Sequence, residues 1–167
     1  MLLAWSSLLS SVLLIASVVI LLAAALHDII ARTVPNWMAA GLALLGLISQ
    51  LLHGHPLPGL LAAVVVFALS AFCWRRGWLG GGDVKLLGAT ALVVPPGQVV
   101  TFIFAVSLAG AALALIYLAA RTMIAVPGPR PTRLLARAIR VECWRIRRSG
   151  PLPYALAIAS GFLFISL

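Results

Sequence analysis

The chain has 167 residues, of which 63% are hydrophobic and only 9% charged, and its mean hydropathy is +1.17. Soluble domains carry about 25% charged residues, so this composition excludes a water-soluble globular protein. A net charge of +9 also occurs in nucleic-acid-binding proteins, but here the arginines flank apolar segments, where they meet lipid headgroups or fix topology. We expect an all-α, polytopic membrane protein that does not bind nucleic acid.

The first apolar run covers residues 3–26 and is about 36 Å long as a helix, which exceeds a hydrocarbon core of about 30 Å. It is longer than the apolar part of a signal peptide, so we expect a retained spanning helix. The run stops next to Asp28, and a short polar connector follows. Pro35 disfavours helix at Val34, and Asn36 is a good N-cap for the next helix.

Six spans are expected in all. They cover residues 3–26, 37–52, 57–74, 83–94, 99–120 and 151–167. The fourth has only about a dozen residues before two prolines and cannot cross a full bilayer unaided, which fits a site that must admit water. The turn between the second and third spans holds His53 and His55, which lack further ligands for a metal. Cys73 and Cys143 have no CxxC spacing and are expected to be free thiols.

Residues 121–148 form a basic loop with eight arginines and Glu142. Within it, Arg133, Arg137 and Arg140 share one helical face, with apolar residues turned elsewhere. This pattern predicts an amphipathic helix lying on the membrane surface. Anionic lipids are the favoured partner of this loop, and contact with a substrate is the alternative.

The charged residues test this arrangement of spans. Six alternating spans put Asp28, Arg32, Arg75, Arg76, Asp83, Lys85 and the basic loop on one side. The positive-inside rule makes that side cytosolic, so the protein would lie in the inner (cytoplasmic) membrane with both termini on the outer side. We expect a single membrane-embedded domain, residues 1–167, without internal repeats.

Two carboxylates at matching depth require an explanation, because burying one near hydrocarbon costs several kcal/mol. If Asp28 and Asp83 lie on neighbouring helices, they share a proton. One can then take a proton from water while the other protonates a scissile carbonyl, as in aspartic proteases, with no metal or cofactor. Glycines 80–82, directly before Asp83, would let an extended substrate backbone approach closely.

Other interpretations of these residues stay open at this point. Asp83 could cap its helix, Asp28 could pair with Arg32, and the glycines could serve helix packing. Lys85 should point away from Asp83, towards headgroups or substrate. Residue types alone therefore leave a protease, a proton- or ion-coupled carrier that uses the same carboxylates, or a structural membrane subunit.

At these motifs the sequence resembles the type IV prepilin peptidases, which are GxGD-type membrane aspartyl proteases. The residues that carry the likeness are Gly80-Gly81-Gly82-Asp83, its continuation Val84-Lys85-Leu86, Asp28 with Val34-Pro35-Asn36, and a weaker third stretch, Pro153-Tyr154-Ala155. The resemblance implies that Asp28 and Asp83 are the catalytic pair. It assigns Gly80, Gly82, Lys85, Pro35 and Asn36 to the surrounding motif.

The resemblance also implies a substrate. Precursors of type IV pilins or pseudopilins would lose their short basic leader at the cytosolic membrane face, just before their hydrophobic segment. Larger members of the family carry an added domain with paired CxxC motifs and also N-methylate the new terminus. This sequence has no CxxC, so methyltransferase activity is not expected, and the chain is similar to the compact peptidases of Flp/Tad-type pilus systems.

Overall fold

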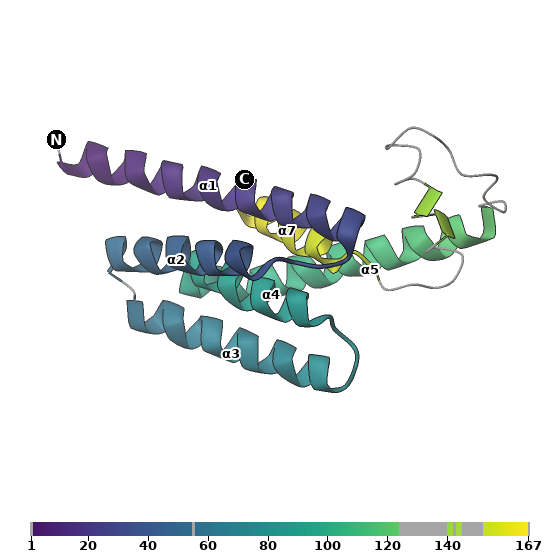
Figure 1. Cartoon of the computed structure of the whole chain (residues 1–167). Helices are drawn as coiled ribbons and strands as arrows, with labels where there is room; N and C mark the ends of the chain where they lie inside the picture. Colours follow the sequence, from purple (N-terminus) through teal and green to yellow (C-terminus); the bar gives the residue numbers. More distant parts are fainter. Residues whose placement is uncertain (1, 55, 124–139, 142, 145–151, 167) are drawn as a thin grey trace.

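The computed structural model describes residues 2–54, 56–123, 140, 141, 143, 144 and 152–166. The secondary structure of these residues is helical, with no β-strand among them (Figure 1). The elements in chain order are α1 (Leu2–Ala31), α2 (Asn36–Leu52), α3 (Pro56–Arg75), α4 (Gly81–Val93), η1 (Pro96–Gln98), α5 (Val99–Met123) and α7 (Tyr154–Ser166). The all-α fold class is confirmed for this part of the chain.

Three helical segments are long and apolar enough to cross a membrane: Ser7–Ala31, Pro56–Arg75 and Pro96–Met123. Two shorter apolar helices accompany them, Asn36–Leu52 and Tyr154–Ser166. The outward faces carry large apolar side chains that would be costly in water, such as Leu57, Val100 and Leu115, each more than 60% exposed. The molecule is therefore built for a lipid environment.

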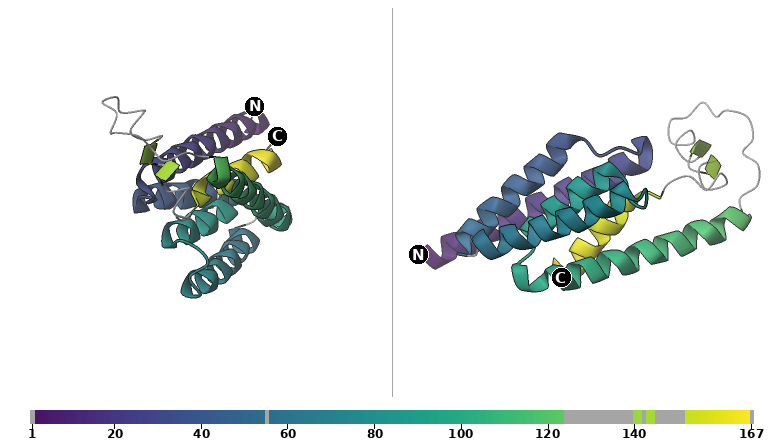
Figure 2. Two further views of the ribbon diagram at one scale, coloured as in Figure 1. Left: turned by 90° about the vertical axis from the view of Figure 1, so that its right-hand side faces the viewer. Right: turned by 90° about the horizontal axis from the view of Figure 1, so that it is seen from below.

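The short helix α4 lies inside the bundle, packed against α2, α3 and α7 (Figure 1, Figure 2). From Val84 to Leu92 every residue except Lys85 is buried. α1 packs on α2 and α7, and α5 pairs mainly with α7. A helix of 13 residues can exist in this position because neighbouring helices, rather than lipid, surround it.

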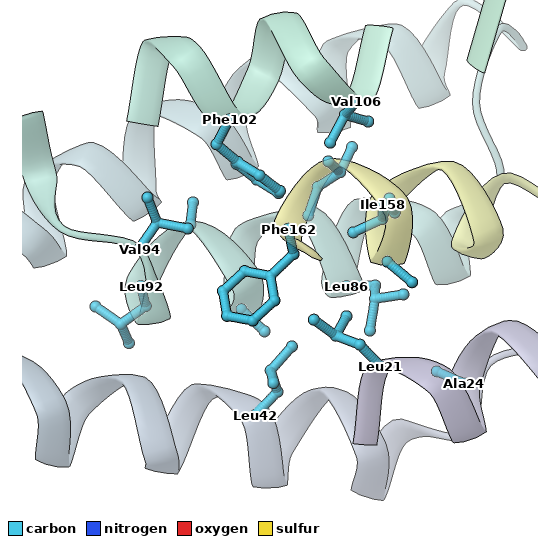
Figure 3. Close-up of a cluster of buried hydrophobic side chains, with 14 of the residues drawn as sticks. Leu21, Ala24, Leu42, Leu86, Leu92, Val94, Phe102, Val106, Ile158 and Phe162 are labelled. Atoms are coloured by element: carbon cyan, nitrogen blue, oxygen red, sulfur yellow. The ribbon is translucent and has the colours of Figure 1, made fainter. Parts of the chain in front are cut away.

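Side chains from five helices meet in the core, where Figure 3 shows Leu21 of α1, Leu42 of α2, Leu86 of α4, Phe102 of α5 and Phe162 of α7. Glycines set the closest approaches between these helices. A Cβ on Gly46 would lie 2.8 Å from the backbone of Leu92, and one on Gly161 would lie 2.6 Å from Val106. Small residues of this kind let membrane helices approach each other closely.

Gln50 fixes the far end of α4. Its Nε2 donates hydrogen bonds of 3.0 Å to the carbonyl oxygens of both Leu92 and Val94, and the side chain is only 3% exposed. Two prolines follow Val94 and supply no N–H group, so these carbonyls need a partner from elsewhere. Gly59 makes room for the amide, since a Cβ there would lie 2.4 Å from Gln50 Cδ.

Two expected helix boundaries are wrong. The first helix continues beyond residue 26 to Ala31, and Asp28 lies within its last turn. The helix ends where Arg32 adopts a left-handed φ of 57° while its N–H still bonds to the carbonyl oxygen of Asp28. Asn36 is not an N-cap but the first residue of α2. Pro35, with φ −60° and ψ 139°, occupies the cap position.

Candidate active site

One end of the bundle carries the charged side chains. The C-terminal ends of α1 and α3 and the N-terminal ends of α2, α4 and α7 lie there, and the C-terminal end of α5 projects beyond them on the same side (Figure 1). We call this the charged end; its described charged residues include Asp28, Arg32, Arg75, Arg76, Asp83, Lys85 and Arg121. In the part of the chain that the structure describes, the opposite end has no Asp, Glu, Lys or Arg.

Asp28 lies against the start of the last helix. Its carboxyl group is buried, and Oδ2 accepts a hydrogen bond of 3.3 Å from the backbone N–H of Ala155. Ala155 is the second residue of α7, whose first N–H groups have no partner within the helix. The positive end of the α7 dipole therefore faces Asp28 and stabilises negative charge there.

Asp83 is the third residue of α4, and Gly80 takes the N-cap position. The Asp83 carboxylate accepts a hydrogen bond from the backbone of Gly80. In a capping box, the side chain of the third helical residue bonds in this way to the backbone N–H of the N-cap residue. A Cβ on Gly80 would lie 2.7 Å from Asp83 Oδ2, closer than such atoms approach in real structures. Gly80 thus leaves the space that the carboxylate occupies.

The two aspartates come together at the charged end. Asp28, from α1, and Asp83, from α4, are within range of mutual electrostatic repulsion, and the guanidinium of Arg32 attracts Asp83. The helices that carry them both pack on α2 and on α7, which set their relative position. Both carboxylates also lie at the N-terminus of a helix, α7 for Asp28 and α4 for Asp83.

The connector before α2 packs on the start of α4. A Cβ on Gly82 would lie 3.2 Å from Val34 Cβ, so glycine permits this close approach. Lys85 Nζ donates a hydrogen bond of 2.8 Å to Asn36 Oδ1. The packing of α2 on α4 thus gives Lys85 a partner on another helix, and its contact with headgroups or substrate stays a prediction.

Tyr154 belongs to this site although the sequence pattern marks it only as part of the Pro153-Tyr154-Ala155 stretch. It is half-buried and lies within electrostatic range of both Asp83 and Cys73. Its ring packs on α5 at Gly110, where a Cβ would lie 2.9 Å from Tyr154 Cε2. A tyrosine at the start of an otherwise apolar helix is the signal that could have identified it.

The chain was compared with models of protein families, with curated proteins and with solved structures. The model of the type IV leader peptidase family matches residues 3–115, a range that contains Asp28, Asp83 and the glycines before Asp83. Comparison with curated proteins and with solved structures found no match. Because the matched range covers more than half of the sequence, the chain belongs to the type IV leader peptidase family, a family of proteases.

Proposed function

We propose that this protein is a membrane aspartyl endopeptidase that removes the short basic leader from type IV prepilin or pseudopilin precursors. Membership of the type IV leader peptidase family supports both the protease activity and this class of substrate. The observation that carries the catalytic assignment is the convergence of Asp28 and Asp83, from distant parts of the chain, at the charged end.

In the proposed reaction the two carboxyl groups share one proton. The ionised aspartate takes a proton from a water molecule, whose oxygen attacks the scissile carbonyl carbon. The protonated aspartate gives its proton to the carbonyl oxygen, which forms a neutral tetrahedral diol. The aspartate that took the water proton then protonates the amide nitrogen, while a diol hydroxyl gives its proton to the other, now ionised, aspartate. The C–N bond breaks, the amine and the carboxylic acid leave, and the pair again shares one proton. Either aspartate can hold either role.

Six spans, over residues 3–26, 37–52, 57–74, 83–94, 99–120 and 151–167, are part of this proposal. The charged end would face the cytosol, following the positive-inside rule, and both termini would lie on the outer side of the inner membrane. Most of the basic loop, residues 121–148, lies outside the described residues, as does most of its expected amphipathic helix. We propose that this loop binds anionic lipids.

The rival functions receive less support. Membership of a peptidase family gives no support to a proton- or ion-coupled carrier. A carrier would also need a polar route between the two sides, and the turns at the uncharged end give it little support. The sequence holds no CxxC motif, and we propose no methyltransferase activity.

The proposal is tested by co-expressing the protein with a candidate prepilin and reading leader removal as a mobility shift. Asp28→Asn and Asp83→Asn preserve side-chain size, so each variant should insert into the membrane yet leave the precursor uncut. Membrane fractionation confirms insertion. Processing by both variants at the rate of the unaltered protein would show that the catalytic assignment is wrong.

A further inference from the structure

We propose that a cavity beside Asp83 is a substrate subsite that binds one large apolar side chain of the precursor's hydrophobic segment. This inference rests on the proposed function and deepens it. The cavity has a volume of about 340 Å³ and lies among α3, α4, α5, α7 and the loop before α4. Neither aspartate is among the residues that line it.

The lining favours an apolar occupant. Val66 of α3, Leu87 of α4 and Ile103 of α5 provide hydrocarbon walls, and Cys73 and Tyr154 complete the end nearer the site. A dry apolar cavity of about 150 Å³ accommodates a benzene molecule. The cavity described here is larger, so an aromatic or branched aliphatic side chain fits, and a small side chain would leave much of it empty.

The cavity adjoins the reacting groups. Leu87 lies four residues after Asp83 on α4, so the two side chains lie on the same face, one turn apart. Trp78 and Leu79 line the cavity and directly precede the glycines that position Asp83. A precursor side chain bound in this cavity would therefore belong to a residue close to the scissile peptide bond, which is cleaved at the two aspartates.

The cavity opens to the outside of the bundle. Leu69 and Trp78, on its rim, are 63% and 72% exposed. α3 and α5 contribute opposite walls but pack mainly on other helices, α4 and α7 respectively. The apolar segment of a membrane-bound precursor can therefore approach from the lipid side, with its cut site at the charged end.

Cys73 provides a direct probe. In purified Cys143→Ser protein, N-cyclohexylmaleimide should modify Cys73 and lower the cleavage rate at least about tenfold, whereas methyl methanethiosulfonate, which adds only an S-methyl group, should have a much smaller effect. Excess uncut prepilin should slow the labelling of Cys73 in the Asp83→Asn, Cys143→Ser variant. Full cleavage by the maleimide-modified protein, or labelling unaffected by prepilin, would overturn the subsite.

Substrate specificity gives a second measurement. Large apolar residues next to the cut site of the prepilin are replaced by alanine one at a time. Replacement of the residue that occupies the cavity should lower kcat/KM at least about tenfold, which measures the preference for its large side chain. Val66→Phe narrows the cavity and should reduce this preference. Val65→Phe is the matched control, since Val65 is 56% exposed on the same helix and does not line the cavity.

The outcomes separate the two proposals. If the unmodified protein leaves every prepilin uncut, the proposed function itself fails. If it cleaves prepilin but Val66→Phe retains the full preference for the large side chain, the function stands and the subsite is wrong.

Discussion

The backbone N–H of Ala155 donates a hydrogen bond to Oδ2 of Asp28, 127 positions earlier in the chain. This contact ties the start of α7 to the last turn of α1. α7 lies beyond residues 3–115, the part that matches the family model. The last helix therefore contributes a backbone donor to one carboxylate and the Tyr154 side chain near the other.

Ala155→Pro tests this donor. Proline has no N–H, and the first turn of a helix tolerates it because those N–H groups have no partner within the helix. The variant should lose the bond to Asp28 and cleave prepilin at least about tenfold more slowly, because a small misplacement of a reacting group is costly. Ala155→Gly keeps the donor and should cleave much faster than Ala155→Pro. Equal rates for both variants would contradict the role of the N–H group.

Gly80→Ala should displace the Asp83 carboxylate. The added Cβ would lie 2.7 Å from Oδ2, so the carboxylate must move. We expect a loss of cleavage of about a hundredfold, measured as initial rate with purified protein. Gly97→Ala is the control, because a Cβ there meets nothing within 4 Å. If the Gly80→Ala variant is as active as Gly97→Ala, the added methyl group does not displace the Asp83 carboxylate and the prediction is wrong.

The bond between Lys85 and Asn36 predicts coupling between two motifs. Lys85→Met and Asn36→Ala should each lower stability modestly, by about 1 kcal/mol, because both side chains are exposed. Thermal unfolding in detergent should show that the double variant is hardly less stable than either single variant. Fully additive losses would mean that the two residues act independently.

Gln50→Leu should destabilise the protein. The substitution leaves the carbonyl oxygens of Leu92 and Val94 without their side-chain donor at a buried position, at a cost of about 1–3 kcal/mol for an unsatisfied group. The melting temperature should therefore fall. Gln98→Leu, at an exposed position near the same end, should change it much less. A similar melting temperature for both variants would argue against the proposed role of Gln50.

Much of this architecture is predictable from the sequence. Apolar runs separated by prolines, glycines and charges locate the helices, because length and hydropathy suffice for membrane segments. Each of the six runs forms a helix in the described residues. That each one crosses the membrane stays a prediction. The predicted end of the first helix is wrong because a charged residue such as Asp28 usually marks the end of an apolar segment. In the structure the hydrogen bond from α7 allows Asp28 to be buried within the last turn of α1.

The partners of individual side chains were not predictable. The sequence gives no sign of a partner for Lys85, because Asn36 lies on another helix and only the packing of α2 on α4 brings the two together. The same holds for Gln50, whose position in an apolar run gives no hint of the carbonyl groups at the end of α4. The spacing of residues within one segment predicts which side chains share a face of a helix, but it does not predict which side chains of other helices they contact.

The central claim is that Asp28 and Asp83 act as one unit on one water molecule. The most direct test measures single-turnover cleavage of prepilin by purified Asp28→Asn, Asp83→Asn and the double variant. If the aspartates act together, each single variant should lose at least about a thousandfold in rate, and the double variant should be no slower. Substantial cleavage by either single variant, or losses that multiply in the double variant, would contradict the pair.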